Sequence, residues 1–226
     1  GLTETSPILT ASTPDKIRIG SAGFPLEEVE LRIAEDGEIQ AKGPNIMLGY
    51  YKLPEKTKEV FTDDGWFCTG DIGHIDKDGW LFITDRKKSM FKLSTGKYVA
   101  PQPIENALIN SGFIDQAMVI GSEQKFCGAL IVPDWKNLEK RFDRFGHDMP
   151  NEDRTTNEHV IARVQKEVDK INKTLAHWER VKKFALLEEP FSIEKGELTP
   201  KMSVKRSAVR ANNKELIESM YNEEKS

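Results

Sequence analysis

The sequence lacks several features that would place it directly in a protein class. Its only two cysteines, Cys68 and Cys127, form neither a disulfide framework nor a metal-ligand spacing, and the four histidines are scattered, which speaks against structural zinc. No apolar run approaches the roughly 20 residues of a membrane-spanning helix, and the N-terminus carries no signal-peptide pattern. We therefore expect a cytoplasmic protein in a reducing setting. Peripheral contact with a membrane stays open.

An excess of charge of one sign is also missing. The 33 basic and 37 acidic residues are mixed along the chain and give a formal charge of -4. Such a chain has no broad positive electrostatic potential that would attract nucleic acid, so any anionic ligand must be bound by a local group of residues. The 226 residues, 38% of them hydrophobic, are enough to build one large domain or two small ones. The sequence assigns no oligomeric state.

Turn signals divide the first part of the chain into short strands. "VELRIAEDGEIQAKG" predicts two strands around the Asp36-Gly37 hairpin turn, and "GHIDKDGWLFIT" repeats the device at Asp78-Gly79. One helix, "LPEKTKEVF", is expected to begin at Pro54, because proline is tolerated in the first helical turn. This region is predicted to be mostly sheet.

Four charged residues, Asp85 to Lys88, interrupt the strand pattern, as is typical of a solvated linker. After them the periodicity predicts helices at "QPIENALINS", "WKNLEKRFDRF", "HVIARVQKEVDKINKTLA" and "SAVRANNKELIESMY", with strands at "DQAMVIG" and "CGALIVPD". The polar "GHDMPNEDRTTNE" is predicted to be a surface loop. We expect a mixed α+β fold: a β-rich region over 1–84, a hinge over 85–88 and a small α+β domain over 89–226.

Several short motifs fit ordinary structure when each is taken alone. "LTET" suits an exposed turn with a helix cap, "GWFCTGD" a tight glycine turn, and "ELTPKMSVKR" a basic loop before the last helix. Their order along the chain changes the interpretation. A Thr-Glu pair is followed by "GWFCTGD", by "DGWLFITDRKK", by a glycine loop ending in "PIE", and by "GELTP" with "KR" behind it.

In this order the motifs resemble the acyl-adenylate-forming superfamily, and within it the long-chain fatty acyl-CoA synthetases. The resemblance runs from Gly1 to the end of the chain. It implies a ligase for a long-chain fatty acid, in which a carboxylate attacks the α-phosphate of ATP and coenzyme A then displaces AMP. Since one anion must approach another, such a site needs positive charge, oriented donors and Mg²⁺.

The resemblance also has implications for the extent of the chain. The β-rich region would be the terminal part of a larger N-terminal AMP-binding domain, and 89–226 would be the complete C-terminal lid domain. The phosphate loop and acyl tunnel of such enzymes would then lie upstream. We expect such a C-terminal fragment to be inactive alone.

Four residues near the start and middle of the chain fit nucleotide chemistry. Glu4 offers a hard oxygen ligand for Mg²⁺, and the neighbouring Thr3 hydroxyl can donate to a phosphate oxygen. Asp71 can accept from both hydroxyls of a ribose, and Arg86 carries a planar fork of donors for a ribose or phosphate oxygen. In the family the matching residues have these roles.

Two further positions are assigned through the resemblance. Lys88 stands where relatives carry the hinge residue about which the lid domain turns between the half-reactions, and a charged, solvated segment suits such a change. "KLSTGKYV" is similar to the loop that meets the thiol arm of coenzyme A, where Gly96 would permit close backbone approach.

The last motif departs from the family pattern Thr-Pro-x-x-Lys-x-Lys-Arg, since Ser203 stands where the catalytic lysine is expected. Serine supplies no positive charge, so the role falls to Lys201 or Lys205, which would share one face of an extended segment with Ser203. Lys201 is narrowly favoured. Two alternatives stay open: a catalytically impaired binding module, and a ligase for acyl or aryl acids that loads a carrier protein.

Overall fold

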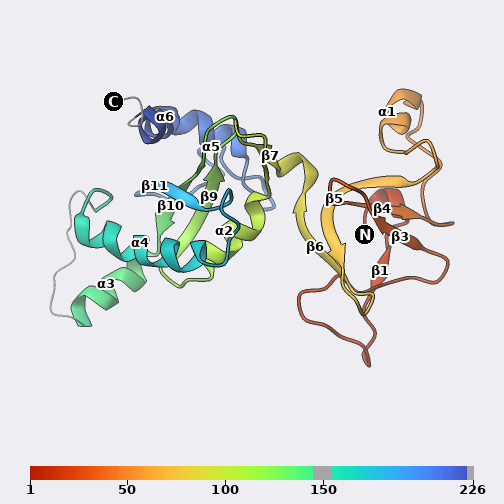
Figure 1. The fold of residues 1–226 in the computed structure, drawn as a ribbon, viewed down its shortest axis with the longest axis horizontal. Coiled ribbons are helices and arrows are strands. Elements are labelled where there is room, and N and C mark those ends of the chain that lie inside the picture. Colours follow the sequence, from red (N-terminus) through yellow and green to blue (C-terminus); the bar gives the residue numbers. More distant parts are fainter. Residues whose placement is uncertain (145–153, 223–226) are drawn as a thin grey trace. The chain divides into compact units, whose positions relative to one another are not determined.

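The computed structural model describes residues 1–144 and 154–222 (Figure 1). The chain divides into two compact units, Gly1–Met90 and Phe91–Ser226. The predicted loop "GHDMPNEDRTTNE" lies mostly outside the described residues. In the part of the chain that is described, no helix is long and apolar enough to cross a membrane.

The unit Gly1–Met90 is built on a four-stranded antiparallel sheet of order β3-β4-β5-β6. Its strands are β3 (Glu30–Ile33), β4 (Glu38–Lys42), β5 (Phe67–Ile75) and β6 (Leu81–Arg86). The smaller elements are η1 (Thr3–Thr5), β1 (Thr10–Ala11), β2 (Phe24–Pro25), α1 (Pro54–Glu59) and η2 (Lys87–Ser89). Both predicted hairpins and the helix that begins at Pro54 are confirmed.

The charged run of this unit does not interrupt the last strand. β6 continues through Arg86, with Asp71 opposite Arg86 and Ile72 opposite Asp85. Asp85 is only 5% exposed, and its carboxylate accepts from the Arg86 N–H at 2.6 Å. The predicted linker therefore does not begin at Asp85, because Asp85 and Arg86 are paired in the ladder; Asp85 is buried and Arg86 is exposed.

The unit Phe91–Ser226 is an α+β layer structure. Its sheet has the order β11-β10-β9, where β9 (Ile114–Ile120) and β10 (Cys127–Pro133) are antiparallel and β11 (Val181–Leu186) lies parallel to β10. A short hairpin joins β7 (Phe91–Lys92) to β8 (Tyr98–Val99). The helices are α2 (Pro101–Ile109), α3 (Trp135–Arg144), α4 (Glu158–Asn172), α5 (Arg206–Asn212) and α6 (Lys214–Asn222).

Helices cover both faces of this sheet, α2 and α4 on one side and α6 on the other (Figure 1). Alternate strand residues point to opposite faces, so Val119 and Ile131 join the cluster with α2, α3 and α4. Met118 and Leu130 join the cluster with α5 and α6. The mixed α/β fold class is confirmed.

The last predicted helix is two helices, so that prediction is corrected. Asn213 separates α5 from α6, with φ -115° and ψ 26° outside the helical region. Its side-chain amide donates to the Val209 carbonyl at 2.9 Å, a local bond that competes with helix continuation.

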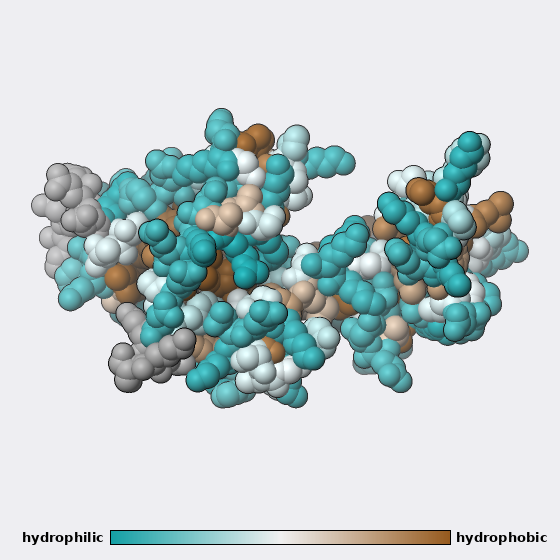
Figure 2. Space-filling view, turned by 90° about the horizontal axis from the view of Figure 1, so that it is seen from above, coloured by the Kyte–Doolittle hydropathy of each residue, from teal (hydrophilic) through white to brown (hydrophobic). Residues whose placement is uncertain are grey.

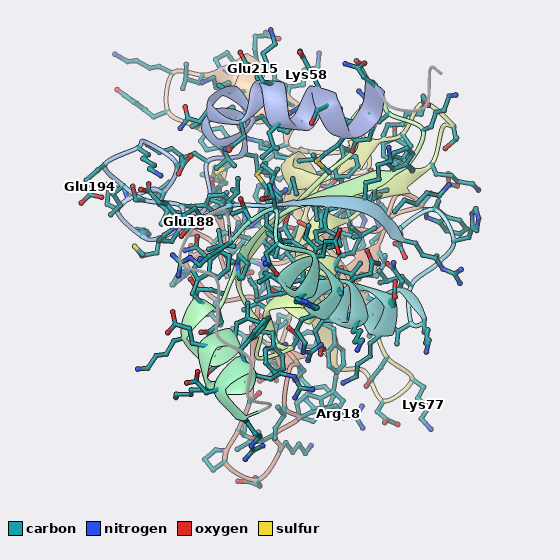
Figure 3. All side chains as sticks on the ribbon, turned by 90° about the vertical axis from the view of Figure 1, so that its left-hand side faces the viewer. Arg18, Lys58, Lys77, Glu188, Glu194 and Glu215 are labelled. Carbon is teal, nitrogen blue, oxygen red and sulfur yellow. The ribbon has the colours of Figure 1, made fainter. Side chains whose placement is uncertain are left out.

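The surface mixes charge with scattered apolar groups. Figure 3 shows the labelled charged side chains, among them Lys58, Lys77 and Glu194, pointing outward. Brown, apolar residues lie among hydrophilic ones in Figure 2, and both Leu48, at 103%, and Tyr51, at 85%, are fully or largely exposed.

Candidate functional site

A pocket of about 620 Å³ lies within the unit Gly1–Met90. It brings together three of the predicted site residues, Glu4, Arg86 and Lys88. The other lining residues come from the chain just before η1, from β4, β5 and η2, and from α1 and the segments beside it: Leu2, Glu38, Tyr50, Glu59, Val60, Phe67, Cys68, Thr69, Gly70, Lys87 and Ser89. Acidic and basic groups therefore share one concave surface.

Asp71 lies beside this pocket, paired with Arg86 across the β5–β6 ladder. Arg86 Nε is 2.6 Å from Asp71 Oδ1, and the arginine side chain is 62% exposed while that of Asp71 is 9% exposed. Oδ1 of Asp71 is itself buried, so its contact with Arg86 is shielded from water. Burial raises the pKa of Asp71, and Arg86 partly offsets that rise.

The turn before Asp71 is fixed by side-chain contacts. Gly70 has φ +72°, and a Cβ there would meet open space, so the glycine both permits the left-handed turn and keeps its pocket side free. The Thr69 hydroxyl donates to the Ile39 carbonyl at 2.7 Å and accepts from the Asp71 N–H at 3.1 Å.

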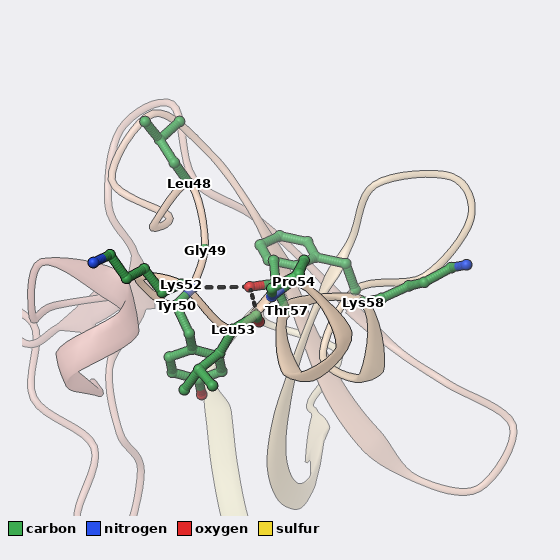
Figure 4. A pocket seen from close by; sticks show the side chains of 9 residues that line it. Leu48, Gly49, Tyr50, Lys52, Leu53, Pro54, Thr57 and Lys58 are labelled. Carbon is green, nitrogen blue, oxygen red and sulfur yellow. Dashed lines mark hydrogen bonds between the residues drawn. The ribbon is translucent and has the colours of Figure 1, made fainter.

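Glu4 is held by a tyrosine that the sequence did not single out. The Tyr50 hydroxyl donates to Glu4 Oε1 at 2.9 Å, and this bond is the main cause of the raised Tyr50 pKa. In Figure 4 the Thr57 hydroxyl of α1 accepts from the Tyr50 N–H and donates to the Leu53 carbonyl. Helix α1 thus orients Tyr50, and Tyr50 orients the carboxylate.

Two other predicted site residues, Thr3 and Lys88, are less constrained. Thr3 is exposed in η1 beside Glu4 and does not line the pocket, and Lys88 is exposed in η2. Among residues 1–144 and 154–222, no three carboxylate, cysteine or histidine groups cluster as metal ligands. A single carboxylate such as Glu4 still fits Mg²⁺, which commonly takes one or two protein carboxylates together with substrate phosphates.

Gly96 belongs to the unit Phe91–Ser226, at the tip of the β7–β8 hairpin. Its φ is +87° and no atom lies within 4 Å of the place where a Cβ would be. The Gly96 N–H donates to the Leu93 carbonyl at 2.9 Å, which closes the turn. The tip is therefore an exposed loop with room for close backbone approach.

Lys201 and Lys205 lie on a second loop of the same unit, and both are exposed. The segment is a hairpin, with Leu198 bridged to Val204 and the Thr199 N–H donating to the Ser203 carbonyl at 2.9 Å. Between these residues the chain turns, and Met202 has φ +62°.

Lys201 therefore does not sit in an extended segment, and the two-residue spacing does not place it on the same face as Ser203. Ser203 and Lys205 flank Val204 on the returning arm, where alternate side chains share a face. The shared-face argument therefore applies to Lys205 and not to Lys201.

A buried ion pair anchors the base of this loop. The guanidinium of Arg206 donates to both carboxylate oxygens of Glu105, at 2.7 and 2.6 Å, and to the Val119 carbonyl at 3.2 Å. Glu105 Oε1 also accepts from the Val119 N–H at 2.7 Å. The residue after Lys205 is thereby fixed to α2 and β9.

Sequence reasoning missed Tyr50, Glu38 and Lys87. Each acts through a contact between residues far apart in the chain, such as Tyr50 with Glu4 or Lys87 with Glu38. No local spacing indicates such pairs. One available signal was the placement of Glu38 directly after the Asp36-Gly37 turn, where a strand begins.

Comparison with solved structures places the fold among adenylate-forming enzymes. The structure of ATP-bound MatB from Rhodopseudomonas palustris aligns with a TM-score of 0.68, at 27% identity, over 96% of this chain and 40% of that chain.

Residues 88–225 match the family described as the AMP-binding enzyme C-terminal domain, and the chain belongs to this family. It is similar to long-chain-fatty-acid–CoA ligase FadD15 of Mycobacterium bovis, 39% identical over 99% of this chain and 38% of that protein. It is also similar to the chloroplastic long-chain-fatty-acid–[acyl-carrier-protein] ligase AEE15 of Arabidopsis thaliana, 34% identical over 98% of this chain and 32% of that protein. The chain spans well under half of either relative.

Proposed function

We propose that this chain carries part of the nucleotide site and the lid domain of an AMP-forming ligase. The enzyme activates a long-chain fatty acid with ATP and transfers the acyl group to coenzyme A. The family membership and the similarity to FadD15 support the reaction class.

One observation carries the nucleotide assignment. The buried carboxylate of Asp71 pairs with the exposed guanidinium of Arg86 at 2.6 Å, beside the pocket that Arg86 lines. A carboxylate can accept from both hydroxyls of a ribose, and a guanidinium paired through Nε keeps further N–H donors for other oxygens. The site therefore fits AMP or ATP on chemical grounds, with Asp71 accepting from the ribose and Arg86 donating to a ribose or phosphate oxygen.

The phosphate side of the site is assigned to the start of the chain. Thr3 donates its hydroxyl to a phosphate oxygen, and Glu4, oriented by Tyr50, is the protein ligand for the metal. Mg²⁺ bound there would offset charge on the phosphates as the carboxylate approaches.

The second half-reaction needs a change of position, which we assign to Lys88. The residue is exposed in η2, directly after β6 ends, so a backbone rotation there disturbs little packing. The Gly96 loop, open at its tip, is assigned to the thiol arm of coenzyme A.

Lys205 is the better candidate for the missing catalytic lysine. It shares the extended arm of the hairpin with Ser203, whereas Lys201 lies in the turn. Its N–H donates to the Glu197 carbonyl at 2.7 Å, and the anchored Arg206 follows it. Its ammonium would stabilise charge on the α-phosphate during adenylation.

The test is ATP–pyrophosphate exchange that depends on a long-chain fatty acid, measured in the whole protein that carries this sequence. Lys205→Ala is expected to slow exchange by on the order of 100-fold or more, as for loss of one charge-stabilising donor. Lys201→Ala is the matched control and is expected to retain most of the rate. The reverse result would move the role to Lys201.

Ser203 favours a second candidate, a protein that binds nucleotide and has lost adenylation. This reading predicts AMP binding without exchange for any carboxylic acid, and with no effect of either lysine. A ligase that loads a carrier protein, as the name of AEE15 describes for that protein, would exchange pyrophosphate but transfer the acyl group to a carrier in preference to coenzyme A.

A further inference from the structure

Glu38 is a buried carboxylate with two different partners. It is the first residue of β4 and is 4% exposed. Its Oε1 accepts from the Gly70 N–H at 2.9 Å, and its Oε2 accepts from Lys87 Nζ at 2.7 Å. Gly70 precedes the ribose-binding candidate Asp71, and Lys87 precedes the hinge candidate Lys88. One side chain thus contacts both segments.

The contact with Lys87 is an ionic one. Lys87 Nζ also lies 2.7 Å from Asp36 Oδ2, and the two carboxylates raise the pKa of Lys87. The partners differ in exposure, since the side chain of Asp36 is 51% exposed and that of Glu38 is 6% exposed. Asp36 contributes most to the raised Lys87 pKa, but water screens the exposed pair more, so we expect Glu38 to be the stronger constraint on the position of Lys87.

We propose that Glu38 is a positioning residue that links the ribose turn to the hinge. The inference rests on the proposed function, which gives Asp71 and Lys88 their roles. If the Gly70 amide or the Lys87 ammonium moved away, a buried negative charge would lose a partner, and such a loss is costly. The Gly70 turn and Lys87 are therefore held at a fixed distance from each other. Backbone rotation at the hinge then begins after Lys87 rather than before it.

Limited trypsin digestion of the whole protein that carries this sequence tests the link directly, because trypsin cleaves after Arg86, Lys87 and Lys88. Glu38→Gln keeps an oxygen for the Gly70 N–H but removes the charge that holds Lys87. We expect cleavage after residues 86–88 to become about tenfold faster, since loss of a charged hydrogen bond raises the population of the open segment. Cleavage after Lys77 is the internal reference.

Asp36→Asn is the matched control, because it removes the exposed partner of Lys87 and leaves Glu38 in place. It is expected to change the rate of cleavage after residues 86–88 by no more than about threefold. Amide exchange at Gly70 gives the other end of the link: it should stay protected in Glu38→Gln and lose protection in Glu38→Ala. Unchanged cleavage in a folded Glu38→Gln variant would overturn the proposal.

A kinetic readout separates positioning from simple stabilisation. In the whole protein, Glu38→Gln and Lys87→Met should slow acyl transfer to coenzyme A about tenfold more than pyrophosphate exchange. Lys87→Arg keeps the positive charge, so both rates should stay near those of the wild type. Equal loss in the two half-reactions would assign Glu38 to stability alone.

The digestion needs no nucleotide, so its result stands apart from the proposed function. If the wild-type protein showed no ATP–pyrophosphate exchange with any carboxylic acid, the ligase assignment would be overturned. The digestion would still decide whether Glu38 links Gly70 to Lys87.

Discussion

The two units of the chain differ in what they bury. Phe91–Ser226 contains two large apolar clusters, one on each face of its sheet. The described residues of Gly1–Met90 form one small cluster, Leu9, Val29 and Ala41. That unit also buries other apolar side chains, such as Ile39 and Phe67, together with a set of polar ones: Thr5, Glu38, Gln40, Thr69, Asp71 and Asp85.

The contrast indicates that Phe91–Ser226 contributes mainly apolar packing, whereas Gly1–Met90 carries more of the polar groups of the candidate site. The buried polar groups in Phe91–Ser226 are glutamates, and Glu105 there fixes a loop base through a bidentate ion pair. In Gly1–Met90, Glu38 holds a turn while the buried Asp71 pairs with the exposed Arg86 at the edge of the pocket. A buried carboxylate whose pKa is raised by burial, beside a pocket, is a reason to expect a functional role.

The largest effect is expected from breaking the ion pair of the larger unit. Glu105→Ala leaves the guanidinium of Arg206 without its carboxylate and the Val119 N–H without its acceptor. We expect the unit to lose about 3–5 kcal/mol, measured by urea unfolding. The transition of Gly1–Met90 should not move; a shared loss would show that the units do not unfold separately.

The same apolar truncation in each unit compares the two cores directly. Ile131 is 0% exposed within the large cluster and Ile39 is 2% exposed on β4. Truncation of a buried isoleucine to alanine costs about 2–5 kcal/mol, less where the site can collapse. In urea unfolding, the loss of free energy of unfolding should lie at the upper end of this range for Ile131→Ala and at the lower end for Ile39→Ala. Equal costs would contradict the difference in packing.

Asp71→Asn should separate function from stability within the smaller unit. Loss of the charged acceptor is expected to weaken AMP binding by about 10- to 100-fold, measured by calorimetry in the whole protein. Burial raises the folded pKa of Asp71 above its ordinary 3.8. The stability that it contributes is thus present below pH 3.8 and lost as the pH rises through the folded pKa.

At neutral pH the charged carboxylate therefore opposes folding, and Asp71→Asn should raise the unfolding temperature of Gly1–Met90. Ile83, exposed on the neighbouring strand, supplies the control: Ile83→Thr should leave AMP affinity unchanged. A variant of Asp71 that lost both affinity and stability would make the carboxylate a structural residue.

The sequence predicted the elements that local patterns control and missed those that depend on distant partners. The hairpins at Asp36-Gly37 and Asp78-Gly79 follow from turn chemistry. β11 has no local signal of comparable strength, because its place is set by parallel pairing with β10. Motif order was sufficient to indicate the family, since it does not depend on the conformation of any one segment.

Candidate site chemistry followed the same division. Glu4, Arg86 and Lys88 were named from motifs and line one pocket. Glu38 and Lys87 become visible only when β4 and the segment after β6 are side by side. Strand pairing also explains the wrong linker start, since a charged residue such as Asp85 is tolerated in a strand when its carboxylate has a donor.

The smallest effect concerns the surface charges that support the smaller unit. Arg32 and the Thr62 hydroxyl lower the pKa of Asp64 from 3.8 to about 2, and the Arg32 guanidinium also stacks on Trp66, 4.4 Å from the ring centroid. A lowered folded pKa means that the contribution of Asp64 is present above pH 3.8 and is lost as the pH falls toward 2.

Gly1–Met90 should therefore weaken in acid across this window, and Asp64→Asn should flatten that slope without a large change near neutral pH, because exposed ion pairs contribute little. Urea midpoints measured for both transitions across the window give the comparison. Glu189, whose pKa is lowered mainly by Lys195, is the matched carboxylate of the larger unit. If Glu189→Gln flattened the acid slope of Gly1–Met90 as much as Asp64→Asn, the slope would report the charge of the whole chain rather than the Arg32 contact.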